Sequence, residues 1–331
     1  MLFSFIIPVY NRPDEIEELL QSMTYFDYEA SFEVVIVEDG SSIPCEHIVE
    51  KYKNTLQISY YFKSNSGPGN SRNFGMQKAK GNYFIILDSD CIVPKEYLTV
   101  VSQSLQNHYV DCFGGPDKAL ATFSNIQKAI NFSMTSFLTT GGIRGGSEKM
   151  DKFQPRSFNM GISKNAFEIS KGFGNIHPGE DPDLSTRLWE LGLQTKLIKE
   201  AYVYHKRRID WNKFYIQVNK FGKARPILNF WYPKYTKLTF WFPSFFLLGF
   251  VLSFILVVFS LPILFYLYLI YFGMIFVSSL VQNKNVTIAV YSIIATAIQF
   301  YGYGIGYLKS FINVFFLKKK PQEAHPELFF K

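Results

Sequence analysis

Two aspartates one residue apart, in the run Asp88-Ser89-Asp90, are the residues of this chain best suited to chemistry. They follow the apolar run at residues 83–87, which predicts a short buried strand. Paired carboxylates at the end of a strand favour a hard divalent cation, because Mg²⁺ and Mn²⁺ prefer oxygen ligands and Mg²⁺ commonly sits between carboxylates and substrate phosphates. The alternative is an ordinary solvated turn, in which Asp and Ser are frequent.

A second acidic cluster, Glu180-Asp181-Pro182-Asp183, stands at the start of a helix predicted at residues 181–191. Carboxylates are common in the first helical turn because the helix dipole stabilises them, so a plain helix start is one interpretation. The catalytic interpretation is a general base that takes a proton from a hydroxyl nucleophile.

The elements that must position these carboxylates alternate between strands and helices. Strands are predicted at 3–9, 32–37, 57–62 and 83–87, with helices at 11–23, 45–52 and 71–78 between them. This order predicts an α/β fold with a doubly wound, mostly parallel sheet, whose ligands bind at the carboxyl ends of the strands. Asp39 and Asp88 both fall there. Further strands are predicted at 158–162 and at 194–204, the latter ending at His205.

Glycines 67, 69 and 75 do not form a dinucleotide-binding fingerprint. Arg72 stands where the third glycine of G-x-G-x-x-G belongs, and the segment follows the third strand instead of the first. A second glycine-rich stretch, at 141–156, predicts either a mobile loop acting as a lid or a surface linker.

The C-terminal part of the chain predicts a membrane region. Lys284 is the only charged residue between Thr239 and Leu308. Segments at 240–260 and 261–281 are each long enough to span a bilayer, and 286–308 is a third candidate, so two or three helices are expected. We therefore expect a catalytic domain at 1–225, a basic linker at 226–238, membrane helices at 239–317 and a polar tail at 318–331.

Basic residues concentrate just before the first predicted span. Nine Lys and Arg residues lie between positions 205 and 237, against Asp210 alone, in a chain of net charge +7. The positive-inside rule places this block, and the domain before it, in the cytosol. Anionic lipid headgroups or a phosphate-bearing substrate are its expected partners, and we expect no nucleic acid. The predicted location is the inner (plasma) membrane, with multiple passes.

These motifs together resemble the family 2 glycosyltransferases, whose catalytic domain has the GT-A fold. The resemblance runs from Phe3 to about Arg225 and rests on several elements in the family's order: Ile7-Pro8-Val9-Tyr10-Asn11, Val37-Glu38-Asp39-Gly40-Ser41, Asn65-Ser66-Gly67-Pro68-Gly69 with Arg72, Asp88-Ser89-Asp90, Asn159-Met160-Gly161, Gly179-Glu180-Asp181-Pro182-Asp183 and His205.

The resemblance implies a role for each of these positions. The nucleotide-sugar would be bound by Pro8, Tyr10, Asn11, Asp39, Gly67, Arg72, Asp88 and Ser89. Asp39 would accept the uracil N3–H, which favours a UDP-sugar. Mn²⁺ or Mg²⁺ would be held by Asp90, Asp88 and His205. Asp181 would be the catalytic base, Glu180 would orient the site, and Asp183 would bind the acceptor sugar.

The activity implied is that of an inverting, metal-dependent hexosyltransferase acting on a lipid-linked or glycan acceptor in cell-surface polysaccharide assembly. The chain lacks the Gln-x-x-Arg-Trp signature of processive synthases downstream, which favours transfer of one sugar. Transfer to a polyprenyl phosphate is the alternative. A nucleotidyltransferase would be expected to carry a glycine-rich loop after its first strand, where this chain has Tyr10-Asn11-Arg12-Pro13. A non-enzymatic membrane scaffold is the remote alternative.

Overall fold

The chain forms two compact units in the computed structural model, which describes residues 1–118, 123–141, 153–206 and 210–330. Unit 1 comprises Met1–Lys118, Gly146–Lys206 and Phe329–Lys331, and unit 2 comprises Ala119–Gly145 and Arg207–Leu328. This division differs from the expected one, whose boundary after residue 225 falls inside a continuous helix of unit 2. Most of the loop predicted at 141–156 lies outside the described residues.

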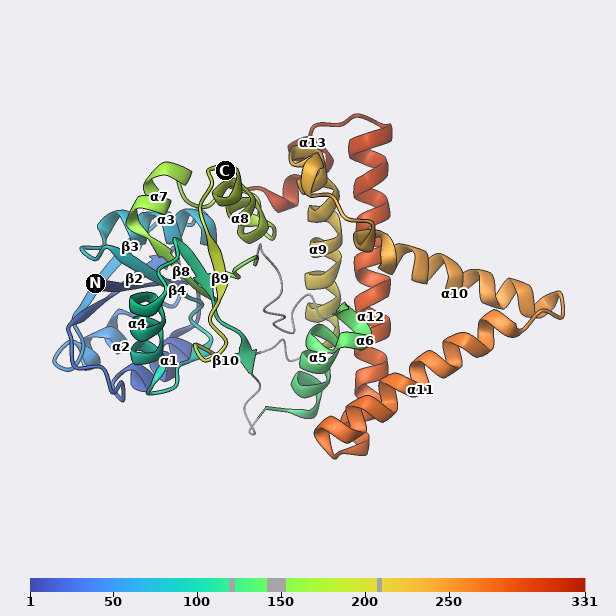
Figure 1. Ribbon diagram of the computed structural model, residues 1–331, viewed down its shortest axis with the longest axis horizontal. Helices are drawn as coiled ribbons and strands as arrows, with labels where there is room; N and C mark the ends of the chain where they lie inside the picture. The colour runs from blue at the N-terminus through green and yellow to red at the C-terminus, as the bar shows by residue number, and fades with distance from the viewer. Residues whose placement is uncertain (119–122, 142–152, 207–209, 331) are drawn as a thin grey trace. The chain divides into compact units, whose positions relative to one another are not determined.

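A seven-stranded sheet forms the centre of unit 1, in the order β3-β2-β1-β4-β8-β6-β9 (Figure 1). Its strands are β1 Phe3–Val9, β2 Phe32–Asp39, β3 Ile58–Lys63, β4 Tyr83–Leu87, β6 Cys112–Gly114, β8 Asn159–Ser163 and β9 Thr195–Leu197. Strand β8 pairs antiparallel with β4 and β6, and the other neighbours are parallel. The predicted mostly parallel α/β sheet is confirmed.

Helices cover both faces of this sheet because successive residues of each buried strand point to opposite sides. On β1, Phe5 and Ile7 share a core with Leu19 of one helix layer, while Ile6 packs with Met76 of the other. The first layer contains α1 Pro13–Met23, α2 Glu46–Tyr52 and α4 Tyr97–Asn107, and the second contains α3 Pro68–Lys78, α7 Lys164–Ser170 and α8 Glu180–Glu190.

A small second sheet brings His205 to the acidic run. It consists of β5 Cys91–Ile92, β10 Val203–His205 and β7 Asp117–Lys118. The prediction of one strand at 194–204 is therefore wrong: β9 belongs to the large sheet and β10 to the small one. The chain turns between them, where the Ala201 N–H donates to the Ile198 carbonyl at 3.2 Å and the Ala201 carbonyl accepts a hydrogen bond from Asn159 Nδ2 at 2.8 Å. As a result His205 pairs with Cys91, the residue after Asp90.

Unit 2 is helical. It contains α5 Asn125–Thr135, α6 Phe137–Thr140, α9 Trp211–Trp231, α10 Phe242–Val258, α11 Ile263–Asn283, α12 Val286–Phe311 and α13 Pro321–Ala324. Helices α9 and α12 pack closely because glycines line their contact. A β-carbon at Gly222 would clash with the Tyr303 carbonyl, and Asn219 Nδ2 donates to the Gly302 carbonyl at 3.0 Å.

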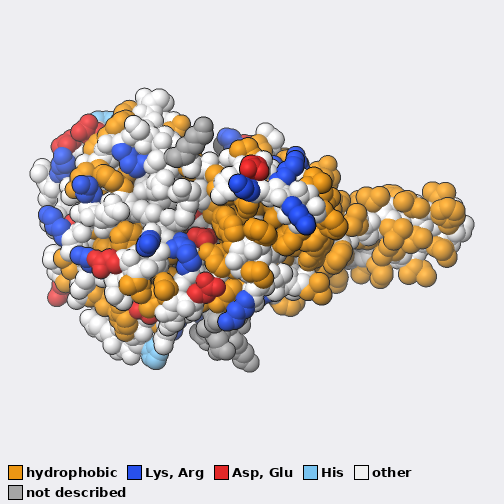
Figure 2. Space-filling view, turned by 90° about the horizontal axis from the view of Figure 1, so that it is seen from above, with side chains coloured by type: hydrophobic (Ala, Val, Ile, Leu, Met, Phe, Trp, Pro, Cys, Tyr) orange, Lys and Arg blue, Asp and Glu red, His pale blue; other side chains and the backbone are white. Residues whose placement is uncertain are grey.

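Three helices are long and apolar enough to cross a membrane: Leu238–Val258, Ile263–Asn283 and Val286–Phe316. Of the two or three spans expected from the sequence, the structure therefore offers three candidates. Figure 1 shows α10 and α11 as a hairpin that extends away from α9 and α12, and Figure 2 shows that hydrophobic side chains cover it. Val258 at its tip is 81% exposed, a surface that suits lipid.

Candidate active site

The carboxyl ends of β1, β2 and β4 meet at one edge of the large sheet, as predicted. Because these strands are parallel neighbours, the residues that end or follow them, Tyr10, Asp39 and Asp88, lie along that edge. Tyr10 is 52% exposed at the surface of this edge, whereas Pro8 is half-buried within β1.

Asn11 connects the loop after β1 to the loop after β2. Its Oδ1 accepts hydrogen bonds from the backbone N–H groups of Ser42 at 2.8 Å and Ile43 at 3.1 Å. Its φ of +52° is a left-handed conformation that asparagine tolerates better than most residues. In this structure Asn11 therefore fixes the entry to α1, and its predicted nucleotide contact stays a prediction.

Asp39 anchors the loop that precedes α3. Its two carboxylate oxygens accept the backbone N–H groups of Ser66 at 2.9 Å and Gly67 at 3.0 Å, and the carboxylate pairs with Lys63. Gly67 has φ +86°, a region that favours glycine. A carboxylate oxygen can accept two hydrogen bonds, so the predicted bond from a uracil N3–H to Asp39 remains compatible with this arrangement.

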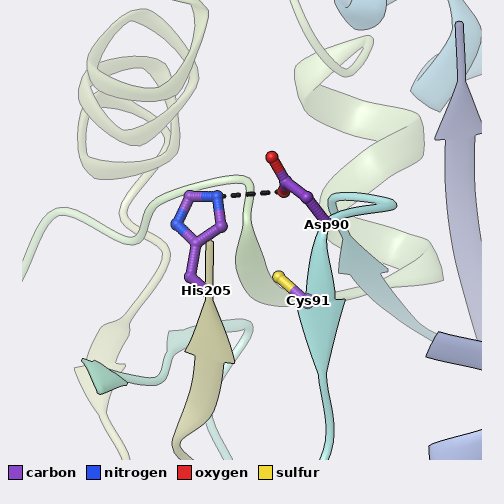
Figure 3. Close-up of side chains that lie close together, drawn as sticks. All are labelled: Asp90, Cys91 and His205. Atoms are coloured by element: carbon purple, nitrogen blue, oxygen red, sulfur yellow. Dashed lines mark ion pairs between the residues drawn. The ribbon is translucent and has the colours of Figure 1, made fainter. Parts of the chain in front are cut away.

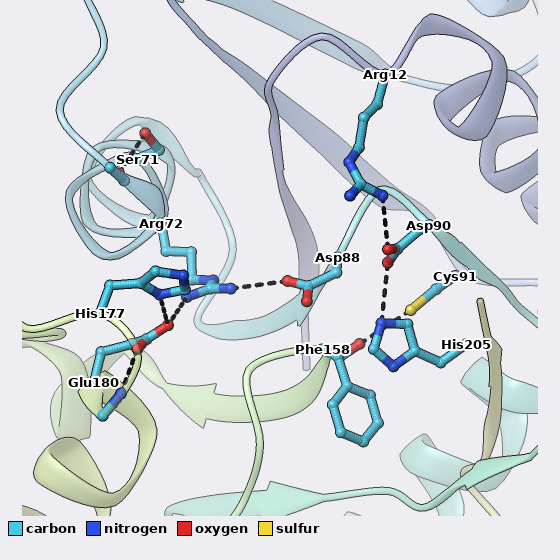
Figure 4. A network of polar contacts seen from close by, with 12 residues as sticks. Arg12, Ser71, Arg72, Asp88, Asp90, Cys91, Phe158, His177, Glu180 and His205 are labelled. Atoms are coloured by element: carbon cyan, nitrogen blue, oxygen red, sulfur yellow. Dashed lines mark hydrogen bonds and ion pairs between the residues drawn. The ribbon is translucent and has the colours of Figure 1, made fainter. Parts of the chain in front are cut away.

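Arg72 joins the two acidic clusters. Its side chain is 3% exposed; Nη2 lies 2.8 Å from Asp88 Oδ1 and Nη1 lies 3.0 Å from Glu180 Oε1 (Figure 4). The guanidinium also stacks over the ring of Phe173 at 5.3 Å. The sequence placed Arg72 along the nucleotide pocket, but both Nη groups face carboxylates. It therefore holds the two clusters together electrostatically.

Glu180 and Asp181 begin α8 with opposite electrostatic environments. Burial favours the neutral form of Glu180, but His177 and Arg72 outweigh it and lower its pKa to about 2. Burial and the adjacent charge of Glu180 raise the pKa of Asp181 to about 6. Among the described residues, the buried Asp181 Oδ1 has no hydrogen-bond partner. Such a carboxylate is suited to accept a proton near neutral pH.

Asp90 and His205 form the centre of a possible metal site (Figure 3). His205 Nε2 lies 3.1 Å from Asp90 Oδ1, and the His205 ring stacks on Phe158 with centroids 4.8 Å apart. Cys91 Sγ belongs to the same group of potential ligands. Burial holds the pKa of the Cys91 thiol well above its usual range, and its Sγ donates to the Phe158 carbonyl at 3.4 Å. A carboxylate with an imidazole suits Mn²⁺.

Two other predicted site residues, Ser89 and Asp183, are buried, and Asp183 is also paired with an arginine. Ser89 is 5% exposed, between the two aspartates. Asp183 pairs with Arg187 at 2.7 Å, and Arg187 in turn binds the Gly172 carbonyl at 2.6 Å. This pairing ties α8 to the segment before it, so acceptor binding by Asp183 stays a prediction.

Sequence reasoning missed three residues beside the site. Arg12 contacts Asp90, and His177 Nδ1 lies 2.9 Å from Glu180 Oε1. The Phe330 ring lies 6.0 Å from the His177 ring and packs on Gly67, where a β-carbon would clash with it. His177 stands three residues before Glu180, a spacing that the sequence displays. No local pattern indicates Phe330, which lies more than 150 residues after His177 in the chain.

The sequence also matches known proteins. The family model described as Glycosyl transferase family 2 matches residues 4–168. Over 114 residues the chain is 38% identical to poly(ribitol-phosphate) beta-N-acetylglucosaminyltransferase TarS of Staphylococcus aureus strain Mu50. That match covers 34% of this chain and only 20% of TarS.

Solved structures share the fold at low identity. TarS 1-349 in complex with UDP-GlcNAc aligns with a TM-score of 0.52 and 18% identity, over 93% of this chain and 91% of that one. The mannosyltransferase PcManGT from Pyrobaculum calidifontis, in complex with GDP-Man and Mn²⁺, aligns with a TM-score of 0.53 and 16% identity, over 67% and 62% of the two chains. The chain therefore belongs to the family 2 glycosyltransferases and has their GT-A fold.

Proposed function

We propose that this glycosyltransferase moves one sugar from a UDP-sugar to a hydroxyl group of a lipid-linked or glycan acceptor, with inversion at the anomeric carbon, at the cytosolic face of the membrane. The observation that carries the proposal is the divided acidic site: Arg72 connects Asp88, beside the possible metal ligands, to Glu180 and Asp181. One half suits a nucleoside diphosphate with its cation, and the other suits a hydroxyl nucleophile.

On the donor side, Tyr10 and Asp39 would bind the nucleoside, and Asp90 with His205 would hold Mn²⁺ or Mg²⁺. The fit rests on donor chemistry, because a carboxylate oxygen and an imidazole nitrogen lie 3.1 Å apart and face each other. When bound, the cation neutralises the negative charge that develops on the departing diphosphate. UDP-GlcNAc is the first donor to test, because TarS binds it.

On the acceptor side, Asp181 would take the proton from the acceptor hydroxyl as its oxygen attacks the anomeric carbon. The C–O bond to the acceptor forms while the bond to the diphosphate breaks on the opposite face, which inverts the anomeric configuration. Glu180 stays ionised next to Asp181, since His177 and Arg72 lower its pKa to about 2. Its charge raises the basicity of Asp181, and positioning of the hydroxyl supplies further acceleration.

The three apolar helices support an acceptor that resides in the membrane. The basic residues of α9, among them Lys220, would lie near anionic headgroups or near the phosphate of a lipid carrier. An acceptor carrying a sugar hydroxyl and a bare polyprenyl phosphate would give products of different mass.

The test uses the full chain in nanodiscs with Mn²⁺, a panel of nucleotide-sugars and membrane lipid extract, followed by mass analysis of the lipid product. We expect a sugar added to a lipid-linked glycan, no product with Asp90→Ala, and retained donor binding without transfer for Asp181→Asn. Failure of the wild type to bind or hydrolyse any nucleotide-sugar would refute the proposal. A sugar attached directly to polyprenyl phosphate would replace the acceptor assignment.

A further inference from the structure

Arg12 is a basic side chain that contacts the carboxylate of Asp90 from the side opposite His205. Within the described residues, Arg12 Nη1 lies 2.8 Å from Asp90 Oδ2, while His205 Nε2 faces Oδ1 (Figure 4). The Arg12 side chain is 32% exposed and the Asp90 side chain 10%. A partly solvated guanidinium therefore contacts a nearly buried carboxylate.

The backbone holds Arg12 in this place. Asn11, just before it, is fixed by its hydrogen bonds to the loop after β2. Pro13, just after it, starts α1 with its ring-locked φ. Arg12 thus stands on a rigid corner, and its side chain makes no capping hydrogen bond to α1. Arg12 Nη1 lies closer to Asp90 Oδ2, at 2.8 Å, than to Glu15 Oε1, at 3.6 Å.

The geometry leaves Asp90 able to hold a cation while Arg12 stays in contact. Ligands of an octahedral ion at about 2.1 Å lie about 3 Å apart when adjacent. The 3.1 Å between Asp90 Oδ1 and His205 Nε2 matches that spacing. Arg12 occupies the other oxygen, Oδ2, where it does not block the ion but fixes the orientation of the carboxylate.

The charges, however, disfavour a cation on the donor-free protein. The negative charge of Asp90 is paired with Arg12, and that of Asp88 is paired with Arg72. A divalent ion therefore meets carboxylates that are already balanced, and a guanidinium one carboxylate away repels it. A nucleoside diphosphate supplies the missing negative charge.

We propose that Arg12 makes divalent-metal binding depend on the nucleoside diphosphate, so that this enzyme binds metal and donor as a unit and not metal first. The inference rests on the proposed function, because it takes Asp90 as a metal ligand. Linkage makes the effect reciprocal: whatever factor the diphosphate adds to metal affinity, the metal adds to diphosphate affinity.

The experiment titrates Mn²⁺ into the full chain in nanodiscs, with and without UDP, and follows free Mn²⁺ by electron paramagnetic resonance. We expect weak Mn²⁺ binding by the wild type without UDP and much tighter binding with it. Arg12→Gln removes the charge and keeps a hydrogen-bond donor, so it should tighten Mn²⁺ binding without UDP about tenfold, roughly the effect of the repulsion between a unit charge and a divalent ion on either side of a partly solvated carboxylate. The gain in Mn²⁺ affinity from UDP should shrink correspondingly.

Arg12→Lys and Lys206→Gln are the matched controls. Arg12→Lys keeps the charge and should keep the weak binding of the wild type. Lys206 pairs with Glu18 at 2.7 Å, and its backbone N–H donates to the Asp90 carbonyl, so Lys206→Gln removes one nearby charge without touching the Asp90 carboxylate. Its Mn²⁺ affinity should stay within about twofold of wild type, because the charge of Lys206 is already paired with Glu18 and does not contact the Asp90 carboxylate.

The results distinguish the role of Arg12 from the assignment of Asp90 as a metal ligand. Unchanged or weaker Mn²⁺ binding by Arg12→Gln overturns the role of Arg12, and so does equal tightening by Lys206→Gln, because a general charge effect would then suffice. Asp90→Asn should lose Mn²⁺ binding with UDP present. If it does not, or if the wild type binds no Mn²⁺ even with UDP, the metal assignment in the proposed function fails instead.

Discussion

The proposed role of Asp181 predicts the pH dependence of transfer. Burial and the charge of Glu180 raise its pKa to about 6, against the opposing effects of Arg72, Arg156 and a hydrogen bond from Ser157. A general base works only when deprotonated, so the rate of transfer should rise with pH through this value and level off above it.

The magnitude follows from the titration of one carboxyl group. At pH 5, one unit below the pKa of about 6, roughly a tenth of the molecules carry an ionised Asp181. We therefore expect kcat/KM for the acceptor at pH 5 to be about tenfold below its plateau. Glu180, with its pKa lowered to about 2, stays ionised from pH 5 to 8. It therefore adds no second rising limb to the plot of rate against pH.

The assay measures kcat/KM for the acceptor from pH 5 to 8 at saturating donor, with donor binding measured in parallel. Two variants serve as controls. Glu190 is an exposed carboxylate at the other end of α8, so Glu190→Gln should leave the profile unchanged. His177 contacts Glu180 and is an ionisable neighbour of the acidic pair, so His177→Gln should retain the rise of the rate with pH if Asp181 causes it.

A flat profile between pH 5 and 8 would refute the assignment of Asp181 as the base. Loss of the rise with pH in His177→Gln would show that Asp181 is not its source. An Asp181→Asn variant that still transfers sugar at a wild-type rate would exclude any role of this carboxylate in proton transfer.

Three further changes test the architecture of the site and of the membrane region. Arg72→Met leaves the buried Glu180 carboxylate and the partly exposed Asp88 carboxylate without their shared cation and should lower the free energy of unfolding by about 3–5 kcal/mol, measured by thermal unfolding against Arg72→Lys; an unchanged Tm would contradict the bridging role. Gly222→Ala forces a β-carbon onto the Tyr303 carbonyl and should cost about 1–3 kcal/mol in the same assay while donor binding is retained, whereas wild-type stability would contradict the close helix contact. Phe330→Ala removes the ring that packs on Gly67 and should raise the donor KM several-fold, while the pH dependence of transfer stays the same. An unchanged donor KM would show that the ring does not support the donor loop.

Much of the donor side could be predicted from local patterns. The apolar runs before Asp39 and Asp88 are buried strands, and their parallel order brings both aspartates to one edge. Each of these inferences needs only a short stretch of sequence and the rule that parallel strands share their carboxyl edge.

Pairings between residues far apart in the chain could not be predicted from the sequence. Residues 194–204 were predicted as one strand, because an apolar run shows neither where a strand changes sheets nor which neighbour it pairs with. The split into β9 and β10 is what sets His205 beside Cys91 and Asp90. The extent of α9 also could not be predicted. This one helix runs from the expected catalytic domain into the expected linker.

The sequence by itself determined the order of the first four strands and their three helices, the acidic residues at the strand ends and the apolar segments near the C-terminus, because these follow from local composition and spacing, and its family resemblance implied the reaction class. Only the tertiary structure decided that Arg72 bridges carboxylates 16 and 108 residues away and that Arg12 reaches Asp90 across 78 residues. The physical reason is that an ion pair between residues far apart in the chain is fixed by which elements pack together, and packing depends on the whole chain.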